Sequence, residues 1–181
     1  MILSDSELVE MLREPRTRRE GFAVLVKQYS EKLYWKVRRI VLSHEDANDV
    51  LQNVFIKVWS NLQNFQGKSS LSTWLYRIAI NESLDFLRKQ KLADKVSADE
   101  DVSVASRLMS DEYFDGDEVQ TRIQEAVARL PEVQRTVFNL KYFEEMKYSE
   151  MSQILNTSEG ALKASYHLAV KKITEYLHLF D

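Results

Sequence analysis

Apolar residues recur along much of the chain at spacings of three and four, which places them on one side of an α-helix. The longest such run extends from about Arg18 to Leu42. Its predicted buried face consists of Phe22, Leu25, Val26, Tyr29, Leu33, Val37 and Ile40. A capping box of Ser4 with Glu7 predicts a short helix before it, and a third helix is predicted to begin after Ser43 and Asp46 and to run to about Leu62.

The segment NFQGKSS interrupts this pattern, and helical spacing resumes after it. Five further helices are predicted, over Leu71 to Lys91, Val119 to Leu130, Glu132 to Phe143, Tyr148 to Leu155 and Ser158 to about Leu177. Pro131 is expected at a first-turn position. Because the chain has only 4 Gly and 2 Pro in 181 residues, few turns are forced on it. We therefore expect an all-α protein.

The net charge of -3 is unevenly distributed along the chain. Residues 1–91 carry 15 Lys and Arg against 11 Asp and Glu, whereas residues 92–119 carry 2 against 9. This acidic stretch has no sustained helical period and too little apolar surface to offset the entropy of ordering. It predicts a flexible linker between two small helical domains, residues 1–91 and 120–181. A short apolar patch within the linker could still dock elsewhere: Val104, Leu108, Tyr113 and Phe114.

Several classes of function are disfavoured by composition. The chain has no Cys, which removes disulfides, thiolate metal sites and Cys nucleophiles. Its carboxylates are scattered, and His44, His167 and His178 lack the spacing of a metal site. We expect a protein that is not an enzyme and needs no metal or cofactor.

No apolar run approaches the roughly 18 residues that a membrane-spanning helix needs. The N-terminal MILSDSELVE also lacks the basic region and apolar core of a signal peptide. We expect a cytoplasmic protein without direct membrane insertion.

The C-terminal segment KYSEMSQILNTSEGALKASYHLAVKKI reads as a helix, a tight turn and a second helix. Asn156 suits a left-handed turn position, and Ser158 suits the cap of the second helix. The predicted internal core is Met151, Ile154, Leu155 and Leu162. A stripe of hydrogen-bond donors then follows at intervals of four: Lys163, His167 and Lys171. A recognition helix in a DNA major groove needs such a face, although a plain helical hairpin with solvated lysines shows the same spacing.

The predicted fourth helix has two different sides. Leu71, Trp74, Leu75 and Ile78 share one side, where core packing is the favoured role of Trp74. Another narrow arc holds polar and cationic residues: Thr73, Arg77, Asn81, Arg88 and Lys91. Cations, an amide and a nearby aromatic residue such as Tyr76 suit single-stranded DNA, whose phosphates need charge and whose unpaired bases need stacking and hydrogen bonds.

The predicted third helix, DANDVLQNVFIKVWSNL, has more apolar residues than one core face needs. The core face is formed by Ala47, Val50, Val54 and Val58. The apolar band is extended toward Gln52 and Asn48 by Phe55, Trp59 and Leu62. Such a band is typical of helix-mediated association with a partner, unless the bundle buries it internally.

Taken in order, three segments resemble the extracytoplasmic-function sigma factors over nearly the whole chain. DANDVLQNVFIKVW is similar to the family's polymerase-binding helix, and FQGKSSLSTWLYRIAINESLDFLRKQK is similar to the loop and helix that capture the minus-10 element. LPEVQRTVFNLKYFEEMKYSEMSQILNTSEGALKASYHLAVKKI resembles the minus-35 reader. The acidic linker resembles the segment that threads toward the polymerase's RNA exit path.

The resemblance implies a factor that binds core RNA polymerase, directs it to promoters and assists melting, without covalent chemistry. Its partners would be core polymerase, duplex and melted promoter DNA and, in many family members, an anti-sigma factor. The implied polymerase-binding residues are Asp49, Gln52, Phe55 and Trp59. The implied minus-10 residues are Gly67, Lys68, Ser69, Ser70, Thr73, Tyr76, Arg77, Asn81, Arg88 and Lys91. The implied minus-35 residues are Ser158, Glu159, Ala161, Lys163, His167 and Lys171.

The recognition helix departs from the family pattern. The family often has a Thr at the position of Ala161, and arginines where this chain has Ser165, Leu168 and Val170. Fewer fixed cations should lower DNA affinity and its salt dependence. The alternative function is a helix-turn-helix regulator that works without polymerase, which would explain residues 120–181 but not the partner-facing third helix.

Overall fold

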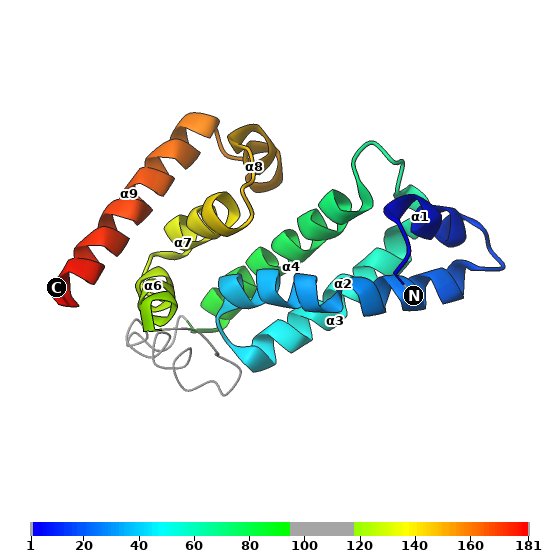
Figure 1. The fold of residues 1–181 in the computed structure, drawn as a ribbon, viewed down its shortest axis with the longest axis horizontal. Coiled ribbons are helices and arrows are strands. Elements are labelled where there is room, and N and C mark those ends of the chain that lie inside the picture. The colour runs from blue at the N-terminus through cyan, green and yellow to red at the C-terminus, as the bar shows by residue number, and fades with distance from the viewer. Residues whose placement is uncertain (1, 95–117, 181) are drawn as a thin grey trace. The chain divides into compact units, whose positions relative to one another are not determined.

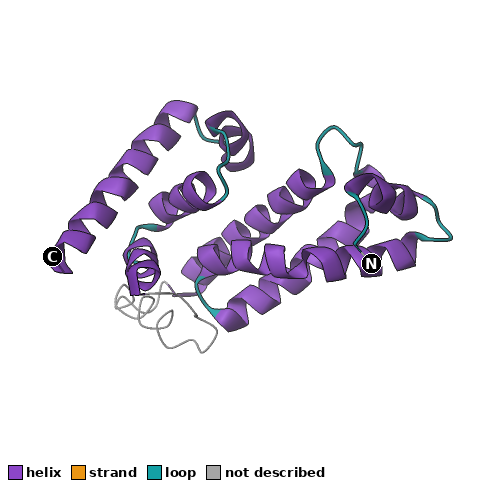
Figure 2. Ribbon diagram, viewed as in Figure 1, coloured by secondary structure: helices purple, strands orange, loops and turns teal. Residues whose placement is uncertain are grey.

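The computed structural model describes residues 2–94 and 118–180, and all of its regular structure in these stretches is helical (Figure 1). The secondary-structure colouring of Figure 2 shows no strand in the described part of the chain. The predicted all-α class is confirmed. The chain divides into two compact units, Met1–Gln90 and Lys91–Asp181. Most of the predicted linker, including its apolar patch at Val104, Leu108, Tyr113 and Phe114, lies outside the described residues.

The N-terminal unit is a helical bundle. Its elements are α1 (Asp5–Arg13), α2 (Arg18–Val41), α3 (His44–Asn61), the short 3-10 helix η1 (Leu62–Asn64) and α4 (Leu71–Asp94). These bounds lie close to the predicted ones. The tight turn between α2 and α3 depends on Leu42, which has a left-handed φ of 69°, and on Ser43, whose hydroxyl caps α3 at the amide of Asp46.

Helix α1 packs closely on α2. Its start has the predicted capping box, in which the Ser4 side chain bonds the Glu7 amide and the Glu7 carboxylate bonds the Ser4 amide. The Ser4 hydroxyl also donates to the Glu7 carboxylate, and this bond, together with the one from the Ser4 amide, lowers the pKa of Glu7. Leu8 and Leu12 are buried, and Gly21 on α2 leaves room for Met11, since a Cβ at Gly21 would lie 2.8 Å from the Met11 Cβ.

The core of the N-terminal unit follows the predicted periodicity. Five of the seven predicted α2 residues are buried, while Phe22 and Val26 are only half-buried at the edge of this face. On α3 the buried side consists of Ala47, Val50, Val54 and Val58. Leu62, which we expected to extend the outer apolar band, is buried instead.

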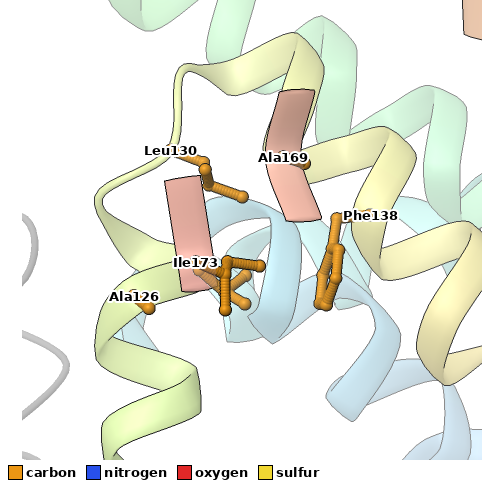
Figure 3. Close-up of a cluster of buried hydrophobic side chains, with 6 residues drawn as sticks. Ala126, Leu130, Phe138, Ala169 and Ile173 are labelled. Carbon is orange, nitrogen blue, oxygen red and sulfur yellow. The ribbon is translucent and has the colours of Figure 1, made fainter. Parts of the chain in front are cut away.

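The C-terminal unit is a second helical core. Its elements are α6 (Glu118–Ala128), α7 (Glu132–Phe138), the π-helix η2 (Asn139–Phe143), α8 (Tyr148–Leu155), α9 (Glu159–Leu177) and the 3-10 helix η3 (His178–Phe180). A buried cluster joins Ala126, Val127 and Leu130, from α6 and the residues after it, to Phe138, Ala169 and Ile173 (Figure 3). This cluster joins α6 and α7 to the C-terminal half of α9, and so fixes the orientation of α9.

The segment 132–143 differs from the single α-helix that we predicted. It widens into a π-helix at Asn139, where the rings of Phe138 and Tyr142 stack at 5.0 Å and Phe138 also stacks on Tyr166 at 5.8 Å. Periodicity does not register one such wider turn. Pro131 is the residue before α7 rather than its first residue.

Candidate functional site

The outer side of α3 is exposed and partly apolar. Asp49 and Gln52 are exposed, and the indole of Trp59 is 41% exposed. Phe55 is half-buried, because its ring and that of Trp59 pack edge to face on Phe22 of α2, at 6.4 and 4.9 Å between centroids. The four predicted polymerase-binding residues therefore form an accessible band along the α2 edge of α3.

Ile56 was not among the predicted residues, but it is 63% exposed between Gln52 and Trp59 on the same outward side. It lies four residues after Gln52 and three before Trp59, a spacing that keeps all three on one helix face. The signal in the sequence was an apolar residue out of phase with Val50, Val54 and Val58. An exposed isoleucine in this position adds apolar contact area to the band.

The outward side of α4 carries polar side chains that are not part of the hydrophobic core. Asn81 and Lys91 are exposed, and Thr73 and Arg77 are half-buried. The Nε of Arg77 is buried and has no hydrogen-bond partner among the described residues. Arg88 donates from Nη1 to Asp85 at 2.6 Å, but both side chains are largely exposed and such surface pairs are weak. Lys91 forms an ion pair with Glu132, so the part of the predicted arc available to a polyanion consists of Thr73, Arg77, Asn81 and Arg88.

The loop before α4 is fixed at both ends. The Phe65 amide bonds the Leu62 carbonyl at 3.3 Å, and the Phe65 ring packs on Trp74 at 5.1 Å between centroids. Trp74 is half-buried in this contact rather than deep in the core. The exposed tip between these anchors contains Gly67, with a φ of +69°, and Lys68.

Ser70 and Thr73 join this loop to α4. The Ser70 hydroxyl accepts the Thr73 amide at 3.1 Å and donates to the Thr73 Oγ1 at 2.9 Å, so Ser70 caps α4. Ser69 is half-buried and donates to the Ser70 carbonyl at 3.3 Å. Ser70 therefore has a structural role as the cap of α4, in addition to any contact that it makes with DNA.

Tyr76 lies on a different side of α4 from Asn81, since five residues correspond to about 140° around a helix. The Lys36 ammonium of α2 lies 4.0 Å from the centroid of the Tyr76 ring. Burial, together with the nearby charges of Arg39 and Lys32, lowers the pKa of Lys36 to about 8. Burial, with a smaller effect from Asp5, raises the pKa of Tyr76. The structure does not bring Tyr76 onto the arc of Arg77 and Asn81.

The C-terminal unit contains the predicted helix-turn-helix. Asn156 closes α8 in the left-handed region at φ 50°, and the Ser158 hydroxyl caps α9 at the Ala161 amide. Met151, Ile154 and Leu162 are buried between the two helices, and Leu155 is half-buried. The turn chemistry that the sequence predicted is present in full.

The outward side of α9 carries the predicted DNA-reading residues. Glu159, Ala161, Lys163, His167 and Lys171 are all exposed. Lys163 lies 5.6 Å from the centroid of the Tyr148 ring on α8, and Lys171 makes an exposed pair with Glu175 at 3.9 Å. Leu168 and Val170 are also exposed, at 46% and 38%. The face is therefore mixed, with three donors interrupted by apolar residues.

Buried Arg135 stabilises the end of α6 in the C-terminal unit. It donates from Nη1 to the carbonyls of Leu130 and Ala128, at 3.2 and 3.5 Å, and so satisfies the end of α6. Burial lowers the pKa of Arg135, while nearby Glu132 opposes this effect. The sequence analysis did not single out this residue.

Within residues 2–94 and 118–180, no three His, Asp or Glu side chains lie close enough together to hold a metal ion. In the same residues, no helix is both long and apolar enough to cross a membrane.

One helical unit with two accessible faces, followed by a unit with a capped helix-turn-helix, defines a DNA-binding protein of the transcription machinery. Residues 25–93 match Sigma-70 region 2, and residues 120–173 match Sigma-70 region 4.

The chain is 33% identical over 157 residues to the ECF RNA polymerase sigma factor SigW of Bacillus subtilis. The aligned region covers 82% of this chain and 84% of that protein. It is 30% identical over 182 residues to the RNA polymerase sigma-H factor of Pseudomonas aeruginosa, over 96% and 93% of the two chains. A solved structure of the sigma factor RpoE with the anti-sigma factor NepR from Bartonella quintana has a similar fold, with a TM-score of 0.67, 20% identity and coverage of 88% of this chain and 98% of that one.

The chain belongs to the extracytoplasmic-function sigma factors. It is an initiation factor that binds RNA polymerase and acts at specific promoters. The alternative of a regulator acting without polymerase is not favoured, since region 2 matches as well as region 4.

Proposed function

We propose that residues 1–91 join core RNA polymerase through α3 and capture an unpaired promoter strand on α4, while residues 120–181 read duplex DNA upstream. The observation that carries this proposal is the contrast between two accessible faces of one unit. The face on α3 is apolar with an acidic flank at Asp49, and the face on α4 is cationic and amide-bearing at Arg77 and Asn81.

The polymerase contact would centre on Trp59 and Phe55. Phe22 holds both rings in place, so little side-chain entropy remains to be lost on binding. Such partly exposed, pre-positioned aromatic residues are typical of binding hot spots. Asp49 and Gln52, which are exposed at the start of the same face, would supply polar contacts at the rim.

The strand contact would use Arg77, Asn81 and the loop at Gly67 to Ser70. The half-buried Arg77 would contact a phosphate or a base edge through the accessible part of its side chain. The exposed Asn81 amide can both donate to and accept from a base. Contacts to an extruded base form only when the duplex is open, so their free energy favours melting. The mechanism needs no covalent step, and no residue is assigned a catalytic role.

The upstream contact would use the outward side of α9. Lys163 and Lys171 would contact phosphates, and Glu159, Ala161 and His167 are exposed on the helix that enters a major groove in this motif. Because Leu168 and Val170 occupy neighbouring exposed positions, few cations anchor this helix. Tethering through polymerase would supply the effective concentration that the isolated unit lacks.

An anti-sigma factor is the further partner that we propose. RpoE of Bartonella quintana was solved with the anti-sigma factor NepR, and CnrH, with a TM-score of 0.63 at 19% identity, was solved with the cytosolic domain of CnrY. A protein that covered the α3 face would exclude polymerase from it. We place the protein in the cytoplasm, where RNA polymerase acts.

Run-off transcription with purified core polymerase on a promoter library tests the function and reads its specificity together. We expect transcripts that depend on both proteins. Promoter binding by the chain that core polymerase does not enhance would contradict the proposal and restore the helix-turn-helix regulator as the explanation.

A further inference from the structure

Arg13, the last residue of α1, lies outside the residues that match Sigma-70 region 2. The end of α1 is held firmly in place. Arg18 donates from Nε to the Leu12 carbonyl at 2.9 Å and from Nη2 to the Arg13 carbonyl at 3.2 Å, while Thr17 donates to the Met11 carbonyl at 2.9 Å. These bonds satisfy the free carbonyls of the helix end, so the backbone of Arg13 has a fixed position.

The guanidinium of Arg13 lies beside the loop that precedes α4. Helix α1 contacts η1, which leads into this loop. A Cβ built on Gly67 would lie 3.5 Å from the Arg13 Nη2, with no other atom outside its chain neighbours within 4 Å. Since Gly67 has a φ of +69° and no side chain, the guanidinium and the loop backbone share one accessible surface.

This guanidinium has no protein partner in the described part of the chain. Arg13 is exposed, and neither a hydrogen bond nor an ion pair joins its side chain to another described residue. The same holds for Lys68, next to Gly67. Arg18 and Arg88, by contrast, both bond groups of the protein. Two free cations at one loop attract an anion, and a guanidinium suits phosphate because its planar fork can donate two parallel bonds.

We propose that Arg13 binds a phosphate of the unpaired promoter strand at the Gly67 loop. This inference rests on the proposed function of α4 and its loop, and it adds α1 to the strand-binding surface. Lys68 supplies a second charge on the other side of Gly67. The strand would thus continue past the Asn81 side of α4 and leave across the end of α1.

The test uses the full-length protein assembled with core polymerase. The probes are fluorescent fork-junction DNAs from one promoter of the library, with a single-stranded non-template extension of increasing length. Arg13→Ala should weaken binding by about three- to tenfold, the effect of one exposed charge-assisted contact. The loss should appear only once the extension is long enough to reach the loop. The salt slope on those probes should fall by about 0.7, since one phosphate contact is lost.

Arg16→Ala is the matched control, because Arg16 is an exposed arginine in the turn that follows α1 and has no partner among residues 2–94 and 118–180. Arg13→Gln keeps the aliphatic stem, so it guards against an effect of unfolding. Tryptophan fluorescence checks the fold, since all three tryptophans, at 35, 59 and 74, belong to the N-terminal unit.

Equal losses for Arg13→Ala and Arg16→Ala would overturn the proposal, because they would reflect net charge alone. A loss that is independent of extension length, or absent in Arg13→Gln, would also overturn it and assign Arg13 a structural role. If the wild-type protein gains no affinity from any extension, the proposed strand capture itself fails. If the wild type gains affinity and Arg13→Ala gains it equally, only the Arg13 contact fails.

Discussion

The indole of Trp59 meets the ring of Phe22 edge to face, with 4.9 Å between centroids and 64° between planes. Trp59 therefore both packs within the N-terminal unit and remains accessible to a partner. One part of the indole packs against α2, and 41% of the residue remains exposed. A side chain that is held in place by a neighbouring helix and is still partly exposed is pre-organised for binding a partner.

Phe55→Ala combined with Trp59→Ala should abolish stable binding to core polymerase and leave the C-terminal unit folded. Because both rings pack on Phe22, the double variant should also lower the free energy of unfolding of the N-terminal unit, by about 1–3 kcal/mol. Circular dichroism must show a folded protein before co-purification with polymerase is measured. A folded double variant that co-purifies at the wild-type level would show that these rings serve the core only.

Ile56→Ser provides a cleaner probe of the same face. Ile56 is 63% exposed, so its replacement should change the free energy of unfolding by less than about 0.5 kcal/mol while weakening polymerase binding about tenfold or more. Ile2→Ser is the matched control, because Ile2 is 89% exposed and lies before α1, outside the apolar band of α3. Equal polymerase affinity of the two variants would remove Ile56 from the interface.

Lys163→Ala and Lys171→Ala should each weaken binding of the polymerase complex to promoters that depend on an upstream element. Each change should also lower the salt slope by about 0.9, as expected for one duplex phosphate contact. Lys171 gives up only an exposed pair with Glu175, so stability should barely change. Lys172→Ala is the control, because exposed Lys172 lies about 100° around α9 from Lys171 and about 180° from Lys163. If all three variants behave alike, this side of α9 does not face the DNA.

The pH dependence of the free energy of unfolding should show the lowered pKa of Lys36. Burial lowers the pKa of Lys36 to about 8 in the folded protein, from an ordinary value of 10.5. Between these two values the unfolded chain holds a proton that the folded chain has lost. The free energy of unfolding should therefore rise with pH above about 8, and the contribution should level off near the ordinary value.

Urea unfolding followed by tryptophan fluorescence, from about pH 7 to about 9.5, measures this slope below the titration range of tyrosine. Lys36→Met should remove the rise. Lys27→Met, which changes an exposed lysine on the same helix, should retain it. A slope that persists in Lys36→Met would mean that another group titrates in this window.

The helices and their packed faces followed from the sequence because each depends on local signals. Ser4 and Ser158 cap the helices that they were predicted to cap, Ser43 caps the helix that was predicted to begin after it, and Asn156 has the left-handed conformation expected of it. Apolar periodicity likewise identified the buried valines of α3. Signals of this kind act over only a few residues, so one sequence is enough to detect them.

The features that the sequence did not show depend on contacts between distant segments. Periodicity could not foresee that Lys36 of α2 would lie over the ring of Tyr76, or that Arg135 would donate to carbonyls at the end of α6. It also could not place Arg13 beside Gly67, since 54 positions separate them and only the packing of α1 brings them together. The candidate strand site was therefore predictable on α4 but not on α1.

Asn81→Ala should reduce promoter melting more than it reduces recruitment of polymerase. Asn81 is exposed one turn beyond Arg77, so its loss leaves the core intact. Its amide can both donate to and accept from a base edge, which alanine cannot do. Losing one base contact costs about 1–3 kcal/mol, which shifts a nearly balanced opening equilibrium about tenfold and leaves contacts to the duplex in place.

Permanganate footprinting of unpaired thymines reports opening by the Asn81→Ala protein, and a gel shift on the same template reports recruitment. A template with a pre-melted bubble separates the two steps, because it removes the cost of unpairing but keeps the base contact. Rescue on this template should therefore be partial, since the base contact is still missing. Opening at the wild-type level on duplex DNA, or equal losses of recruitment and opening, would show that Asn81 does not capture the strand.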